Sequence, residues 1–143
     1  MAYVTAQEMI DLYGREAITD LTDRADPPTY QIDAGILQRA IDAATELLDG
    51  YLGRRYQLPL DTVPVDLQEH ARSAVFFNLH RGRIVGISES VRARYDDAVS
   101  WLDKVAKGEI LLRAATPPAT TGVGSPGFVT GGRTFSRDTL RYF

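Results

Sequence analysis

The sequence contains no cysteine among its 143 residues. Disulfide bonds, thiolate catalysis and cysteine-based zinc or iron–sulfur sites are therefore excluded for this chain. No apolar run approaches the roughly 20 residues that a membrane-spanning helix needs, so we expect no membrane segment. The first residues lack a basic region followed by an apolar one, and we expect no signal peptide. The formal net charge of −3 is small, which argues against a protein that coats nucleic acid through net charge alone.

Motifs for catalysis and cofactor binding are also missing. The sequence holds no Walker lysine motif, no G-x-S-x-G and no H-E-x-x-H. Residues 122–127 match the letters of the dinucleotide fingerprint, but they neither follow a predicted strand nor open a predicted helix. His70 and His80 are the only histidines, and they lie on one predicted helix at a spacing that cannot bind one metal ion. We therefore predict no enzyme activity, no cofactor and no metal site.

The sequence does have helical periodicity, which is strongest over residues 33–52. Apolar residues recur there at spacings of three and four, and this predicts a long amphipathic helix with a broad buried face. Asp33 can cap its start, and Gly53 suits the left-handed residue that closes a helix. Pro59 cannot continue the helix, because proline pushes the preceding residue out of the helical region.

Shorter periodic segments come before this central helix. Thr5 and Glu8 have the spacing of a capping box, which predicts a short helix that ends at Gly14. A second short turn is expected over residues 15–22. The carboxylates of the following loop lack the alternate-residue spacing of a calcium site, so we expect a solvated acidic loop.

Two further helices are expected after the central one. Asp66 can cap the first, and Ser88 or Ser90 can open the second, which should end at Gly108. The predicted fold is all-α, a bundle of about four helices that forms a helical adaptor domain over residues 1–108.

Charge is unevenly distributed along the chain. Acidic residues crowd its beginning, whereas arginines gather in the middle. The arginines that we take as candidate contact residues, at a subunit interface or in a DNA channel, are Arg54, Arg55, Arg81 and Arg83. They could bind phosphate groups, or they could meet the acidic region of a neighbouring copy in a head-to-tail contact. We favour the contact between subunits.

The composition changes again after residue 108. Residues 116–132 are rich in glycine, proline, threonine and serine, which predicts a flexible linker. Beyond it, aromatic and apolar residues alternate with arginines, and this pattern favours docking on another surface. The residues expected to carry the docking are Arg133, Phe135, Arg137, Leu140, Tyr142 and Phe143. We predict that residues 109–143 form an extended arm that orders on assembly and could add a short strand to a sheet edge. The alternative is an arm folded back on its own helices.

Several of these stretches resemble a known family. The run AIDAATELLDGYLGRRYQLPL at residues 40–60, followed by VPVDL at residues 63–67, resembles the small head-completion proteins of Mu-like phages and prophages. Residues 95–102 and 135–140 also resemble this family, so the resemblance covers nearly the whole chain apart from the linker. Its most specific part is RYQLPL with the proline that follows it, and no residue in that part performs chemistry.

The resemblance implies a structural role in a tailed phage. Proteins of this family are similar to the helical head–tail connector adaptor proteins, which form a ring of twelve copies below the portal protein and extend the DNA channel. The implied partners are neighbouring copies of the chain, the portal protein and a tail-side connector or tail terminator protein. Genomic DNA would pass through the lumen without sequence specificity. The protein would be made in the host bacterial cytoplasm and reside in the neck of the virion.

Two other classes of function stay open. One is a DNA-binding module that uses the central arginines, which would bind duplex DNA strongly and lose affinity steeply with added salt. The other is a small enzyme whose site forms only between subunits, for which a metal or ligand bound at an interface would be the sign.

Overall fold

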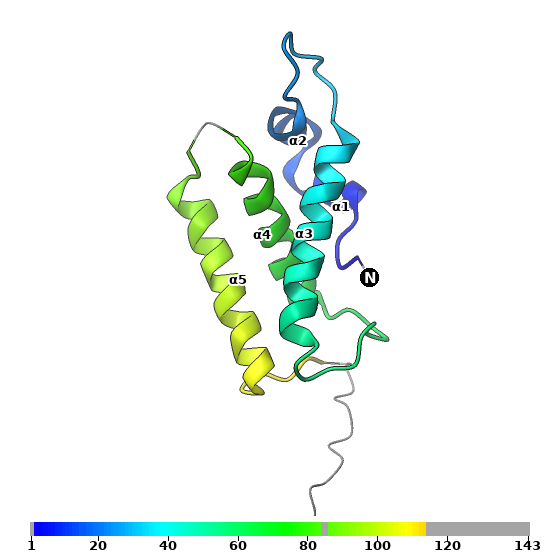
Figure 1. The fold of residues 1–143 in the computed structure, drawn as a ribbon, viewed down its shortest axis with the longest axis vertical. Coiled ribbons are helices and arrows are strands. Elements are labelled where there is room, and N and C mark those ends of the chain that lie inside the picture. The colour runs from blue at the N-terminus through cyan, green and yellow to red at the C-terminus, as the bar shows by residue number, and fades with distance from the viewer. Residues whose placement is uncertain (1, 84–85, 114–143) are drawn as a thin grey trace, which may run out of the picture.

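The computed structural model of the protein describes residues 2–83 and 86–113. Regular structure within these ranges is entirely α-helical, which confirms the all-α prediction (Figure 1). The helices are α1 (Ala6–Tyr13), α2 (Arg15–Thr22), α3 (Ala34–Leu52), α4 (Val65–Arg81) and α5 (Glu89–Lys107). The segment expected to form only a short turn is α2, a helix of 8 residues, so the described part of the chain holds five helices. None of them is long and apolar enough to cross a bilayer.

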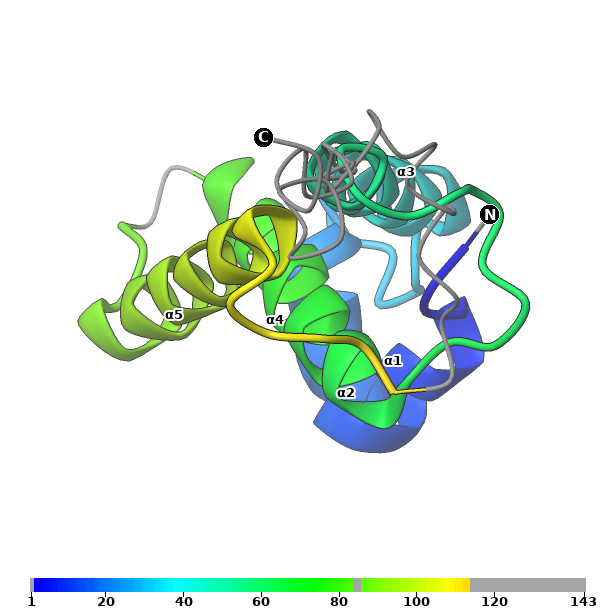
Figure 2. The same ribbon diagram turned by 90° about the horizontal axis from the view of Figure 1, so that it is seen from below.

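The body is built from α3, α4 and α5, which run antiparallel to one another in chain order (Figure 1). α4 lies between the other two and packs on both, and α3 also contacts α5. α1 and α2 pack on α3 and α4, on the side of the bundle away from α5, as the end-on view in Figure 2 shows. Because α3 and α4 are antiparallel, the end of one lies near the start of the other.

Most of the expected helix ends are confirmed. Thr5 accepts a hydrogen bond from the backbone N–H of Glu8, and the Glu8 carboxylate accepts one from the N–H of Thr5, which completes the capping box. Asp33 and Ser88 cap α3 and α5 by a single bond each, since their side chains accept from the N–H groups of Ile36 and Val91. Gly108 closes α5 with φ +82°, a left-handed conformation that glycine adopts without the steric cost of a Cβ atom.

Two expected helix ends are wrong. Gly53 is right-handed, with φ −61°, because the chain continues in a tight right-handed turn in which the N–H of Tyr56 donates to the carbonyl of Leu52. Asp66 does not cap α4, since the helix already begins at Val65 and Pro64 occupies the capping position. The side chain of Pro64 has no oxygen that could accept from the first N–H groups, so this helix starts without a side-chain cap.

The core lies where the three long helices meet. The predicted buried face of α3 is confirmed, and its buried members are Leu37, Ala40, Ile41, Ala44, Leu48 and Leu52. α4 contributes Leu67, Ala71, Ala74, Val75 and Leu79, and α5 contributes Ala98, Leu102 and Val105. Burying a leucine or valine side chain is worth about 1.5–3 kcal/mol, so this shared core is the main source of stability.

Buried polar groups tie the first segments to α3. The hydroxyl of Thr22 donates to the carbonyl of Ile18 and accepts from the N–H of Asp33, which joins the end of α2 to the cap of α3. The hydroxyl of Tyr3 donates to the carboxylate of Asp49. Burial raises the pKa of Tyr3 well above its ordinary value, and the neighbouring Asp49 adds to the shift, since both disfavour a phenolate.

Candidate interaction surfaces

The link between α3 and α4 is joined to the segment that follows α5. The N–H of Leu112 donates to the hydroxyl of Tyr56 at 3.0 Å, and both residues are buried in the core. Arg55 is half-buried with its guanidinium against Gly108, and its Nε has no hydrogen-bond partner among the described residues. Residues 109–113 therefore lie against the body, although the sequence placed them at the start of the arm.

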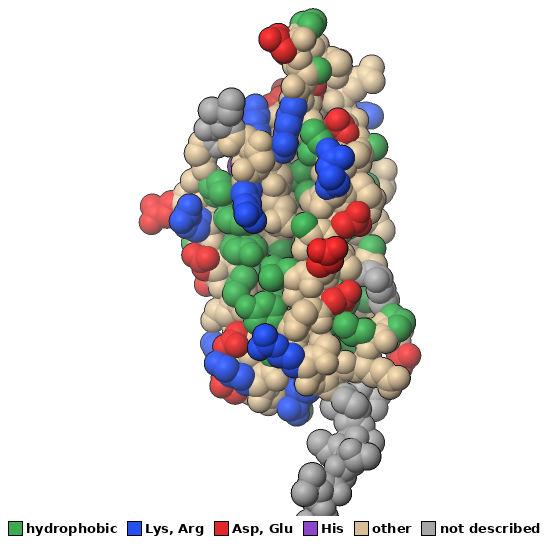
Figure 3. Space-filling model, viewed as in Figure 1, with side chains coloured by type: hydrophobic (Ala, Val, Ile, Leu, Met, Phe, Trp, Pro, Cys, Tyr) green, Lys and Arg blue, Asp and Glu red, His purple; other side chains and the backbone are tan. Residues whose placement is uncertain are grey.

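The four candidate arginines do not form one cluster. Arg54 and Arg55 follow the end of α3, whereas Arg81 and Arg83 lie at the end of α4, which is the opposite end of the bundle (Figure 1). Arg54 is exposed and lies over the ring of Tyr51, with 5.4 Å from its Cζ to the ring centroid. Figure 3 shows the same division, with basic side chains gathered towards the two ends of this face and acidic ones along α3.

Two arginines that the sequence did not single out lie beside the end of α4. A hollow of about 190 Å³ at the end of α4 is lined by Arg24, Arg39 and Gly82, over a floor that includes Asn78 and Leu79. The guanidinium of Arg24 lies against Gly82, which is the residue between Arg81 and Arg83 in the sequence. No carboxylate lines this hollow. No sequence signal pointed to Arg24 or Arg39, because one lies in a loop and the other on the polar side of α3.

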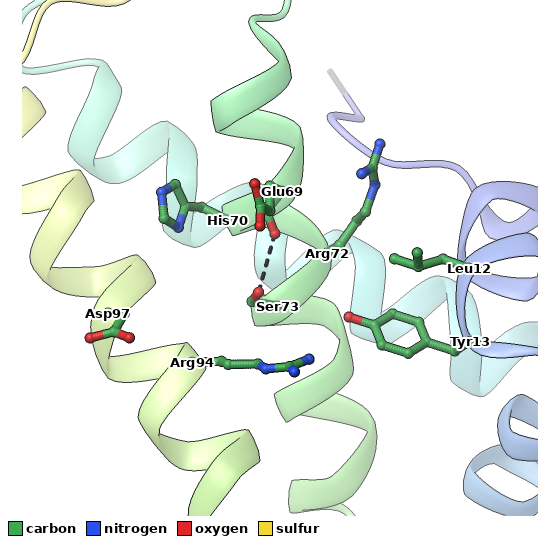
Figure 4. Close-up of a pocket in the computed structure, with 8 residues that line it drawn as sticks. All are labelled: Leu12, Tyr13, Glu69, His70, Arg72, Ser73, Arg94 and Asp97. Atoms are coloured by element: carbon green, nitrogen blue, oxygen red, sulfur yellow. Dashed lines mark hydrogen bonds between the residues drawn. The ribbon is translucent and has the colours of Figure 1, made fainter.

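A larger groove of about 570 Å³ lies between α1, α4 and α5 (Figure 4). Leu12 and Tyr13 come from α1, Glu69, His70, Arg72 and Ser73 from α4, and Arg94 and Asp97 from α5. Leu12 is unusually exposed for a leucine, with 56% of its surface accessible. The groove therefore combines an apolar wall on α1 with charges of both signs on α4 and α5.

Aromatic pairs hold the walls of this groove in place. Tyr13 stacks on Phe76, with 4.0 Å between ring centroids, and so fixes α1 against α4. His70 packs on Trp101 of α5 at 4.4 Å. Stacked aromatic pairs contribute about 0.5–1.5 kcal/mol beyond the area that they bury, so the walls are held by packing as well as by the core.

The charged groups of the groove influence one another. Burial raises the pKa of Tyr13, and the positive charges of Arg94 and Arg72 oppose this shift. Burial lowers the pKa of His70, and Glu69 leads the nearby carboxylates that oppose it. Neither Arg72 nor Arg94 forms an ion pair within the described ranges, and Arg72 donates a long hydrogen bond from Nη2 to Oε1 of Gln68 at 3.4 Å. Arg94 and the remaining N–H groups of Arg72 are therefore available to a partner.

The described residues offer no site for metal chemistry. They contain no group of three or more histidine, cysteine or acidic side chains that could hold an ion. In the acidic loop before α3, Asp23 instead accepts hydrogen bonds from the N–H groups of Ala25, Thr29 and Tyr30. These bonds lower the pKa of Asp23 against the opposing effect of desolvation, and its carboxylate is committed to shaping the loop.

The predicted docking residues of the arm lie outside the described residues. They are Arg133, Phe135, Arg137, Leu140, Tyr142 and Phe143. Their role stays a prediction, and so does the short strand expected on assembly.

Comparison with known proteins gives one family and two relatives. Residues 3–130 match the family described as "Bacteriophage Mu, Gp36". The chain is 36% identical over 86 residues to "Mu-like prophage FluMu protein gp36" of Haemophilus influenzae, an alignment that covers 60% of this chain and 59% of that protein. It is 30% identical over 109 residues to "Gene product J" of Escherichia phage Mu, covering 76% of this chain and 74% of that protein. None of these names describes an enzymatic activity.

Proposed function

Because this chain belongs to the bacteriophage Mu Gp36 family, we propose that it is a structural head–tail connector of a tailed phage. In this proposal copies of the chain assemble head to tail into a ring of twelve below the portal protein. The ring extends the DNA channel, docks the tail-side connector or tail terminator protein, and resides in the neck of the virion. The observation that carries the proposal is the family match, which spans most of the chain.

The described surfaces are consistent with such a role. A ring built by head-to-tail contacts needs two different and complementary patches on each copy. The body offers arginines beside the end of α4 and acidic side chains along α3, and the groove beside α1 offers charges of both signs. A connector also needs no catalytic group, in keeping with the prediction that the chain is not an enzyme.

The first experiment is to measure the mass of the purified protein alone and after mixing with the portal protein of its own phage. We expect the protein to enter a complex with the portal at matched stoichiometry. Deleting residues 131–143 should abolish portal binding or particle assembly, because those residues carry the predicted docking. Unchanged assembly after this deletion would refute the role of the arm.

A DNA-binding module remains the second candidate, and the hollow lined by Arg24 and Arg39 is the observation in its favour. Replacing Arg24 and Arg39 by glutamine tests it. If about three arginines bind phosphates, log K for duplex DNA should fall with log salt at a slope of about −3, and the double variant should flatten that slope. A protein that ignores the portal but shows this salt dependence would favour the DNA-binding function over the connector.

A further inference from the structure

The groove between α1, α4 and α5 has the composition of a docking site for a peptide that is itself both charged and apolar. Its lining offers the carboxylates of Glu69 and Asp97 beside the guanidinium groups of Arg72 and Arg94. Figure 4 shows the charged side chains on α4 and α5, with Leu12 and Tyr13 on α1 across from them. An apolar side chain of the partner could pack on α1 while its charged neighbours pair with α4 and α5.

Two further carboxylates lie near this groove without lining it. Glu8 lies on α1 near Arg72, whose charge adds to the larger effect of the Thr5 backbone hydrogen bond in lowering the pKa of Glu8. Asp66 lies on α4 close enough to influence His70. The lining itself is balanced, with two carboxylates and two arginines, so it suits a partner that carries charges of both signs. The two neighbouring carboxylates add acidic character beside it.

One segment of the chain has that chemistry. Residues 133–143, RTFSRDTLRYF, contain three arginines and one aspartate. Phenylalanine, leucine and tyrosine alternate with these charges, so an extended segment can present apolar and basic side chains in turn. Its arginines match the carboxylates of the groove, its aspartate matches Arg72 or Arg94, and its aromatic rings match Leu12 and Tyr13.

We propose that the groove between α1, α4 and α5 is the docking site for residues 133–143 of this chain. This inference rests on the proposed docking role of the arm and adds the surface that receives it. Nineteen residues separate Arg113, the last described residue, from Arg133. Fully extended they span about 60 Å, about twice the length of a 19-residue helix such as α3, so the segment can reach a groove on its own body or on a neighbouring copy.

The absence of native cysteine allows a direct test by disulfide cross-linking. The test variant carries Ser73→Cys in the groove and Ser136→Cys in the segment, in the otherwise complete chain. The control variant carries Ala43→Cys, on the exposed side of α3, together with Ser136→Cys. Both are oxidised at micromolar concentration, alone and with the portal protein, and the products are separated without reducing agent.

We expect the test pair to cross-link at least about tenfold more than the control pair, because docking raises the local concentration of the two thiols to the millimolar range. A ladder of covalent multimers would support docking between copies, and a cross-linked single chain would support docking of the segment on its own body. Equal cross-linking of the test and control pairs, alone and with the portal, would overturn the proposal.

Charge reversal supplies a second measurement on the same pair. Arg133→Glu with Arg137→Glu should lower the cross-linking of the test variant several-fold, and adding Glu69→Lys with Asp97→Lys should restore it. Failure of the combined reversals to restore cross-linking in folded protein would overturn the charge pairing. If deleting residues 131–143 abolishes portal binding but the groove pair does not cross-link, this inference is refuted and the proposed connector function still stands.

Discussion

Replacing Tyr56 by phenylalanine removes the hydroxyl that accepts the hydrogen bond from Leu112. This bond is the joint between the α3–α4 link and the segment after α5. The ring of Tyr56 stays in the core, where only 3% of its surface is exposed. The N–H of Leu112 loses its acceptor, and Leu112 is itself 7% exposed, so water has little access to replace the missing hydroxyl. A buried donor left without a partner costs about 1–3 kcal/mol.

The free energy of unfolding should therefore fall by that amount, measured by urea denaturation followed by circular dichroism. For a folded part of this size the free energy of unfolding falls by about 1.5–2 kcal/mol for each molar of urea, so the urea midpoint should move down by roughly 1 M. Tyr30→Phe is the matched control, because Tyr30 is 83% exposed and its midpoint should stay within error.

Hydrogen exchange locates the effect on the chain. The Leu112 amide should exchange faster in Tyr56→Phe than in the wild-type protein, by a larger factor than the core amides of α3. A variant with the wild-type midpoint and unchanged protection of Leu112 would refute the idea that this hydrogen bond holds the segment after α5 to the body.

Three further outcomes follow from the same structure and can be checked by the same denaturation assay. Gly108→Ala should lower the free energy of unfolding by about 1–2 kcal/mol, because the residue is left-handed; the Arg55 guanidinium that a Cβ would overlap is the end of a flexible side chain and can move aside. Gly50→Ala, inside α3 where a Cβ meets no other atom, should instead raise the free energy of unfolding by up to about 1 kcal/mol. A fall would contradict the placement of Gly50 at an uncrowded helical position. The free energy of unfolding should fall as pH rises above about 10, because tyrosine ionises there in the unfolded chain while Tyr3 of the folded protein stays protonated beside Asp49. Tyr3→Phe should weaken that fall. An alkaline profile that Tyr3→Phe leaves unchanged would show that Tyr3 does not cause the fall.

Much of the helical body could be predicted from local signals. The capping box at Thr5 and the left-handed Gly108 depend on neighbouring residues alone, and both are confirmed. The buried face of α3 follows from the spacing of apolar residues, which needs no knowledge of the partner helix. α2 was expected only as a short turn because eight residues give too short a window for periodicity to distinguish a turn from a helix.

The remaining features depend on contacts between distant segments. Gly53 was expected to be left-handed because a glycine after a helix usually is, but the tight turn to Tyr56 keeps the chain right-handed. Arg55 was taken as a surface contact, whereas its packing on Gly108 results from a meeting of residues far apart in sequence. The grouping of Arg24 with Arg39 likewise depends on how α2, α3 and α4 pack, which charge alone does not encode.

The joint at Tyr56 also determines how the body would respond to mechanical load. A pull applied beyond Arg113 would reach Leu112 before it reached the last turn of α5, and Leu112 is seated in the core. Its hydrogen bond to Tyr56 would pass part of the tension to the α3–α4 link, so that the load is shared by two helices of opposite direction. The last turn of α5 is thereby shielded from being peeled open, and the body can bear traction on its own chain without unwinding from that end.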